Sequence, residues 1–198
     1  MFQLIETIKV IDGLFQNLPY HNSRLNKARR ELFSVTDELD IEKLVHVPAS
    51  FDKGIYKCTV TYGKEISEIN FQLYIIRRIR NLKIVTDNSI EYSYKYADRT
   101  SLNKLLELKG DCDEIVIVKN SYITDTSFTN LIFFDGVKWY TPDLPLLKGT
   151  KREKLLQQGM IMETRICLDD LTKYSRVGLI NAMLEPEDIM VDIANLKL

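Results

Sequence analysis

Lys95 is the first residue in the sequence whose surroundings suggest chemistry. It lies between two tyrosines in the stretch YSYKYADRTSLNKLL, residues 92–106. A lysine amine that aromatic neighbours partly remove from water can lose its proton and form a Schiff base with a carbonyl compound. A single lysine is more often a solvated surface charge, so its spacing alone leaves both interpretations open.

Other candidate positions also have an ordinary interpretation. Asp125, in ITDTSFTN, is either a carboxylate with a chemical role or a turn aspartate that bonds to its own loop. Gly149 and Thr150, in PLLKGTKREKLL, precede an expected helix whose first N–H groups could bind an anion, although many such helices bind none. His21 and His46 are the only histidines, which argues against a histidine-based triad or a multi-histidine metal site.

In the first half of the chain, these residues would be positioned mainly by strands. Asp12-Gly13 favours a two-residue hairpin turn between two strands. An amphipathic helix is expected over residues 19–33 and a short one over 40–47. Residues 54–87, rich in Tyr, Ile, Val and Thr, predict three successive strands, with RRIR at 77–80 on the solvent side of a strand.

The second half alternates helices and strands. TSLNKLLELKG at 100–110 predicts a helix with a serine or threonine cap and a glycine stop. EIVIV predicts a buried strand, KNSY a turn and NLIFF a further strand, and DG at 135–136 predicts a second tight hairpin before VKWYTP. The last predicted elements are helices over 151–161 and 168–175 and a strand over 177–184.

Composition sets limits on the function. The 198 residues include 27 basic and 28 acidic side chains, a balance that argues against a nucleic-acid surface. Three cysteines far apart argue against a disulfide framework or a zinc site and favour a reducing compartment. The sequence starts without a signal-peptide pattern and contains no apolar run long enough to cross a bilayer, so a cytoplasmic protein that binds no membrane is expected.

Several blocks, taken together and in order, resemble one family. ETIKVIDGLFQNLPYHNSRL, the lysine stretch, ITDTSFTNLIFF, WYTPDLPLLKGTKREKLL and VGLINAML cover nearly the whole chain. They resemble the fold-type IV (class IV) pyridoxal-phosphate enzymes, and most closely the aminodeoxychorismate lyases. The resemblance implies a mixed α/β fold in two parts, a small N-terminal α/β part over 1–84 and a barrel-like part with helices over 85–198. It also implies a homodimer with the cofactor in a cleft between the parts.

The resemblance implies a role for particular residues. Lys95 would form the Schiff base with pyridoxal 5′-phosphate (PLP) and move the substrate's Cα proton. Arg24 would bind the cofactor phosphate, and Asp125, where the family usually has glutamate, would keep the pyridine nitrogen protonated. Arg152 would brace its loop without touching the cofactor. The remaining implied cofactor-binding residues are Asn130, Gly149, Thr150, Lys151, Asn181 and Ala182.

Three functions are compatible with this resemblance. The first is a lyase that converts 4-amino-4-deoxychorismate to 4-aminobenzoate, a folate precursor, and pyruvate, with a small amino compound as its substrate. The second is an aminotransferase for branched-chain or D-amino acids. The third is a degenerate member that binds PLP without turnover, because the chain has only MFQLI before Glu6 and has aspartate at position 125.

Overall fold

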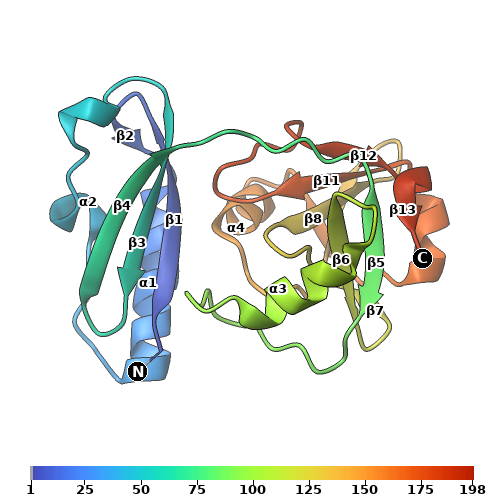
Figure 1. The fold of residues 1–198 in the computed structure, drawn as a ribbon, viewed down its shortest axis with the longest axis horizontal. Helices are drawn as coiled ribbons and strands as arrows, with labels where there is room; N and C mark the ends of the chain where they lie inside the picture. Colours follow the sequence, from blue (N-terminus) through green and yellow to red (C-terminus); the bar gives the residue numbers. More distant parts are fainter. Residues whose placement is uncertain (1) are drawn as a thin grey trace. The chain divides into compact units, whose positions relative to one another are not determined.

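The computed structural model describes residues 2–198. Contacts within the chain divide it into two units: residues up to Ile75 together with Tyr94–Asp98 form unit 1, and Ile76–Ser93 with Arg99–Leu198 form unit 2. These units differ from the ranges 1–84 and 85–198 because residues 76–84 group with unit 2 and the segment Tyr94–Asp98, which carries Lys95, groups with unit 1. The fold is mixed α/β, with several sheets and few helices, as expected (Figure 1).

Unit 1 is a four-stranded sheet with helices. The strand order is β2-β1-β3-β4 and every pairing is antiparallel. Its elements are β1 (Leu4–Ile11), β2 (Leu14–Phe15), α1 (Leu18–Phe33), α2 (Ile41–Leu44), the 3-10 turn η1 (Ala49–Phe51), β3 (Ile55–Tyr62) and β4 (Ile66–Leu73).

The core of unit 1 forms where α1 packs on one face of this sheet. Alternate residues of β1 point into the core, as the period-two pattern of a half-buried strand requires. Leu25 and Ala28 of α1 are buried in the same cluster, which confirms the predicted amphipathic helix. The other main members are Leu4, Ile8, Val10, Cys58, Val60 and Tyr62.

Unit 2 contains two sheets. One has five strands in the order β10-β9-β8-β11-β12, and the other has four in the order β13-β5-β6-β7. The strands are β5 (Leu82–Thr86), β6 (Glu114–Lys119), β7 (Tyr122–Ile123), β8 (Asn130–Phe134), β9 (Trp139–Pro142), β10 (Met162–Thr164), β11 (Arg176–Ile180), β12 (Met190–Asp192) and β13 (Leu196–Lys197). The helices are α3 (Thr100–Leu106), α4 (Thr150–Gln157) and the 3-10 turns η2 (Glu107–Lys109), η3 (Leu168–Lys173) and η4 (Ile193–Asn195).

Helix α4 is fixed to the five-stranded sheet by a small apolar cluster. Leu155 of α4 and Ile161 after it pack with Ile132 of β8 and Ile180 of β11, and all four are buried. This packing holds the helix on the sheet, and Gly149, Thr150 and Lys151, at the start of the helix, are among the predicted cofactor-binding residues.

Two local predictions are wrong. Arg77–Arg80 do not lie on a strand, because β3 begins at Ile55 and leaves no partner for the chain beyond Tyr74. Helix α3 has no serine or threonine cap, because its cap position is Arg99, the residue before Thr100, and the Asn103 N–H donates to the Arg99 carbonyl.

The second hairpin forms where it was predicted. Strands β8 and β9 pair antiparallel on either side of residues 135–138, and the Asp135 N–H donates to the Lys138 carbonyl at 3.2 Å. The Asp135 carboxylate accepts the N–H groups of Val137 and Lys138, at 2.8 and 2.7 Å. These bonds from the side chain close the loop.

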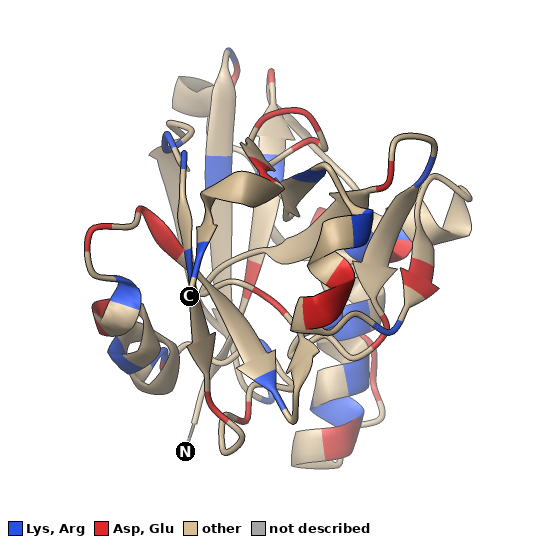
Figure 2. Cartoon of the chain, turned by 90° about the vertical axis from the view of Figure 1, so that its right-hand side faces the viewer, with Lys and Arg blue, Asp and Glu red and all other residues tan. Residues whose placement is uncertain are grey.

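Charges are mixed along the chain. Figure 2 shows basic and acidic residues interspersed over helices, strands and loops, consistent with the formal net charge of −1. Within residues 2–198, the helices are all too short or too polar to span a bilayer.

The first hairpin confirms its prediction and gives a test. Asp12 and Gly13 have φ of 48° and 78°, the left-handed pair that a type I′ turn needs. Gly13→Ala should lower the free energy of unfolding by about 1–2 kcal/mol, because a Cβ is disfavoured at such a φ. Urea unfolding would measure this. Gly63→Ala is the matched control, since no heavy atom lies within 4 Å of the added Cβ; an equal loss in both variants would contradict the explanation.

Candidate active site

Lys95 is half-buried and its backbone is bound to strand β1 of unit 1. The Ile5 N–H donates to the Lys95 carbonyl at 2.9 Å, and Tyr96 forms an isolated antiparallel bridge with Leu4. The hydroxyl of Tyr94 donates to Glu31 of α1 at 2.9 Å. The flanking tyrosines therefore fix the segment that presents Lys95.

Glu6 joins Arg24 to the same strand. The Arg24 Nε and Nη2 donate to the two Glu6 carboxylate oxygens, at 2.9 and 2.6 Å, in a bidentate pair. Nδ1 of His21 lies 2.6 Å from Glu6 Oε2. Glu6 and His21 are fully buried, whereas the Arg24 side chain keeps 17% of its surface exposed. Glu6 thus fixes the orientation of a partly accessible guanidinium.

The titration properties of this cluster follow from its geometry. Burial opposes ionisation of Glu6, but the Arg24 charge and the hydrogen bonds from His21 and Arg24 outweigh it and lower the Glu6 pKa to about 2. Burial, more than any other cause, lowers the pKa of His21 below its ordinary value, and the charge of Lys95 contributes in the same direction. Unit 1 therefore brings Arg24 and Lys95 into one electrostatic cluster around a carboxylate that stays ionised.

Glu6 and His21 were missing from the residues predicted to form the site. A signal was present: Glu6 is the one acidic residue among the alternating positions 4, 6, 8 and 10, which are otherwise apolar. An acid at a buried position of a strand requires charged or hydrogen-bonding partners. Spacing along the sequence does not show which residues of the following helix supply them.

In unit 2, Asp125 is a buried carboxylate at the start of the loop before β8. Oδ2 accepts the Leu147 N–H at 2.9 Å and Oδ1 accepts the Asn130 amide at 2.7 Å. Burial raises the pKa of Asp125 to about 6, although these hydrogen bonds and the Arg152 charge act in the opposite direction. A carboxylate with this environment favours a cationic partner.

Asn130 and Gly149 fit against each other. The Asn130 side-chain amide also donates to the Leu147 carbonyl at 2.8 Å. It therefore bonds both Asp125 and the segment before α4. A Cβ on residue 149 would collide with the Asn130 side-chain oxygen. Glycine is therefore needed here for close approach, and its extended backbone conformation is ordinary.

Thr150 and Lys151 form the start of helix α4, and both are buried. The first amide groups of a helix point out of its end and, with the helix dipole, favour an anion. The Lys151 ammonium donates to Glu185 at 2.7 Å. Arg152 is buried and donates to the Pro142 carbonyl of β9 and to Glu163 of β10, at 2.9 and 2.6 Å.

Asn181 connects the end of β11 to the Asp125 loop. Its side-chain oxygen accepts the N–H groups of Met183 and Leu184, at 2.8 and 3.1 Å, and its amide donates to the Phe128 carbonyl at 3.4 Å. Ala182, half-buried, lies within the turn that Asn181 closes. Unit 2 thus joins Asp125, Asn130, Gly149 and Asn181 through direct contacts.

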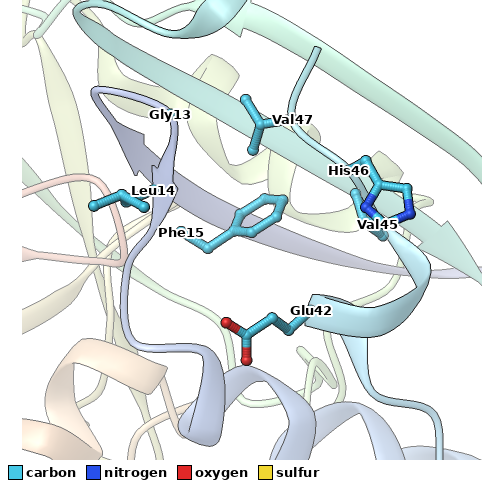
Figure 3. A pocket seen from close by; sticks show the side chains of 7 residues that line it. All are labelled: Gly13, Leu14, Phe15, Glu42, Val45, His46 and Val47. Carbon is cyan, nitrogen blue, oxygen red and sulfur yellow. The ribbon is translucent and has the colours of Figure 1, made fainter. Parts of the chain in front are cut away.

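A separate pocket lies within unit 1. Its walls come from the β1–β2 hairpin, from α2 and from the residues after α2 (Figure 3). Glu42 and His46 are its titratable residues, and none of the predicted site residues lines it. Among residues 2–198, no three His, Cys, Asp or Glu side chains are grouped so that they could hold a metal ion.

Comparison with known proteins decides the family. Residues 93–186 match the model of the amino-transferase class IV family. An uncharacterized protein of Haemophilus influenzae is 40% identical over 185 residues, which are 92% of this chain and 98% of that protein. A solved Haemophilus somnus protein, provisionally described as a 4-amino-4-deoxychorismate lyase, is 36% identical with a TM-score of 0.84, covering 92% of this chain and 97% of the other. This chain belongs to the amino-transferase class IV family.

Membership makes the protein a PLP-dependent enzyme of the class IV lyase and aminotransferase type. The fold also matches the PLP-bound form of a hypothetical aminotransferase from Mycobacterium tuberculosis. That match has a TM-score of 0.75 at 13% identity, covering 98% of this chain and 81% of the other. At that identity only the fold is shared.

Glu6 gives a stability test of the unit 1 cluster. Glu6→Gln should lower the free energy of unfolding by about 3 kcal/mol, because it leaves Arg24 without its buried counter-charge. The Glu6 pKa falls from 4.5 in its ordinary state to about 2 in the fold. Its contribution is therefore complete above pH 4.5 and is lost as the pH falls towards about 2.

Urea unfolding of wild type and variant at neutral and acidic pH measures this difference. Glu38→Gln serves as the control, because Glu38 is an exposed residue of unit 1 whose ion pair with Arg30 lies at the surface. That control should change stability by less than about 0.5 kcal/mol. A Glu6→Gln loss that stays constant from neutral pH to about pH 3 would contradict the assignment of the ionised form to Glu6.

Proposed function

We propose that this enzyme is a 4-amino-4-deoxychorismate lyase that releases 4-aminobenzoate and pyruvate, with PLP as cofactor. The observation that supports it most is the relative provisionally described as that lyase, which is 36% identical and almost entirely covered. The proposal includes cytoplasmic 4-aminobenzoate supply for folate synthesis and a homodimeric assembly, both taken from the family resemblance.

The residues of each unit fit this cofactor. Unit 1 supplies an amine, Lys95, and a guanidinium, Arg24, whose orientation Glu6 fixes. Unit 2 supplies the first amides of α4 for a phosphate and a buried carboxylate, Asp125, that favours a cation. An aldehyde, a phosphate and a protonated ring nitrogen are the three groups of PLP that these residues would bind.

Bound PLP would supply an aldehyde that condenses with amines and a pyridine ring that withdraws electrons from the substrate carbon. Lys95 would bind the aldehyde in the resting enzyme. After the substrate amine replaces it, the Lys95 Nζ would act as a general base and acid, removing a ring proton and returning a proton as pyruvate leaves. Lys95 would thus be the one residue that both binds the cofactor and transfers the substrate's protons.

Arg24 and Asp125 would act by charge. Arg24 would bind the phosphate through its planar guanidinium, and Glu6 would limit the rotamers that the guanidinium adopts. The ionised Asp125 would hold a proton on the ring nitrogen, which maintains the electron withdrawal that the reaction needs. Asn130, Gly149 and Asn181 would hold the Asp125 loop against the start of α4 through the contacts described above.

The reaction itself is tested by supplying 4-amino-4-deoxychorismate and measuring pyruvate release. Wild type should release pyruvate and show the visible absorbance of lysine-bound PLP, and Lys95→Ala should lose both. Lys43→Ala is the matched control, because it makes the same substitution at an exposed lysine of unit 1 that pairs with Asp40.

Other outcomes separate the competing functions. Keto-acid formation from branched-chain or D-amino acids without pyruvate release would contradict the lyase and favour the aminotransferase. PLP uptake without turnover of any of these substrates would favour the degenerate member. A wild type that takes up no PLP would overturn the proposal as a whole.

Asp125 predicts a pH dependence of cofactor affinity. Its pKa in the fold is about 6, so it is ionised above that pH and protonated below it. Asp125→Asn should weaken PLP binding about 10- to 100-fold at about pH 8, where a hydrogen bond to a charged group is lost. The ratio of the two dissociation constants should shrink as the pH falls through about 6.

Equilibrium dialysis of PLP against wild type and Asp125→Asn at several pH values measures this ratio. Taking the ratio removes the pH dependence of Lys95 and of PLP itself, because both proteins share them. A ratio that stays constant between about pH 5 and about pH 8 would show that the ionised form of Asp125 does not contribute to binding.

A further inference from the structure

The loop that carries Asp125 is closed by its own residues but is positioned by side chains from elsewhere in unit 2. Within the loop, the Thr126 hydroxyl accepts the N–H groups of Phe128 and Thr129, at 3.2 and 2.9 Å. These bonds shape the turn. They do not determine where its tip, Ser127-Phe128, lies in the unit.

Glu114, the first residue of β6, contacts that tip from inside the unit. Its Oε1 accepts the Ser127 N–H at 3.3 Å and the Ile115 N–H at 3.0 Å. Glu114 is fully buried, and its Oε2 has no hydrogen-bond donor among residues 2–198. A buried carboxylate oxygen without a donor is costly, so this arrangement calls for a compensating charge.

Arg77 supplies the nearest cation. Its Nη2 lies 3.7 Å from Glu114 Oε2, an ion-pair distance longer than a hydrogen bond. The same guanidinium lies over the Phe128 ring, 4.1 Å from its centroid, in a cation–π contact. Arg77 therefore touches both the buried carboxylate and the tip of the Asp125 loop.

Arg99 bonds the second backbone group of Ser127, its carbonyl. Its guanidinium donates to the Ser127 carbonyl at 2.7 Å. Both backbone groups of Ser127 are thus bound by charged side chains, the N–H by Glu114 and the carbonyl by Arg99. Hydrogen bonds to charged groups are about twice as strong as neutral ones.

We propose that Glu114 is a positioning residue for Asp125, acting through the Ser127 N–H, and that Arg77 balances its buried charge and fixes Phe128. The residues of this set come from three separate segments, so their convergence on one loop tip is a property of the fold. The consequence for PLP binding rests on the proposed function; the positioning of the loop does not.

The first experiment uses the cofactor-free protein. Glu114→Gln preserves shape but removes the charge and directs an amide towards Arg77, so hydrogen exchange of the Ser127–Asn130 amides should rise about tenfold. Glu91→Gln is the matched control, because Glu91 forms an exposed ion pair with Lys119 in the same unit. That control should leave exchange at the loop unchanged.

A second variant guards against a Glu114 variant that fails to fold. Arg77 keeps 58% of its side chain exposed, so Arg77→Ala should fold and still raise exchange at the loop. Arg77→Lys should restore part of the protection, because it keeps the charge and loses the planar contact with Phe128. In the holoenzyme, Glu114→Gln and Arg77→Ala should each weaken PLP binding about tenfold and alter the absorbance of bound PLP.

Two results would overturn the proposal. One is exchange and PLP affinity that remain those of wild type in the folded Glu114→Gln and Arg77→Ala proteins. The other is exchange that rises equally throughout unit 2, which would make Glu114 a general stability residue. If wild type takes up no PLP, the proposed function fails, and the exchange measurements still decide the role of Glu114.

Discussion

The buried carboxylate of Glu6 is the constraint on which the first unit depends. A charge removed from water has to be compensated by charges or hydrogen bonds, and Glu6 receives them from Arg24 and His21 of the neighbouring helix. The helix cannot rotate or slide along the sheet without breaking these bonds. The same strand also bonds the Lys95 carbonyl through the Ile5 N–H. Strand β1 therefore holds both the arginine and the lysine, through the neighbouring residues Glu6 and Ile5.

The buried carboxylate of the second unit, Asp125, has different partners from those of Glu6. Glu6 has a bonded cationic partner and a pKa of about 2, whereas the hydrogen bonds that Asp125 accepts come from neutral amides and its pKa is about 6. The contrast follows from the partners, because both groups are equally removed from water. The charge of Glu6 is compensated by Arg24 and His21 within the protein, so this carboxylate stabilises the fold of unit 1. Asp125 is compensated only in part, which is the state expected of a carboxylate that will bind a cation from outside.

Local sequence signals predicted much of the fold, and failed where contacts between distant segments decide. The turn at Asp12-Gly13 and helix α1 depend on neighbouring residues, so their patterns were sufficient. Arg77–Arg80 alternate like a strand, yet no strand remains for them to pair with. Their alternation reflects the burial of Ile79 alone, and Arg77 contacts Glu114 and Phe128 instead.

The candidate site shows the same division. Lys95, Arg24 and Asp125 were predicted because the family resemblance follows the order of motifs along the chain. The structure adds three residues that contact this set from a distance along the chain. His21 contacts Glu6 across 15 positions, and Glu114 contacts the Asp125 loop from β6. A single sequence does not show such pairings. A buried acid within an apolar strand pattern is nevertheless a visible signal, since Glu6 and Glu114 both occupy such positions.

The aspartate at position 125, where the family usually has glutamate, is compatible with a cofactor role on hydrogen-bonding grounds. A carboxylate can accept about four hydrogen bonds. Asp125 accepts N–H groups from Asn130 and Leu147, and the Leu146 N–H contributes a further bond, which leaves capacity for one more donor. Because Asn130 and Leu147 already fix the plane of the short side chain, a ring N–H would meet a carboxylate whose orientation costs little further entropy.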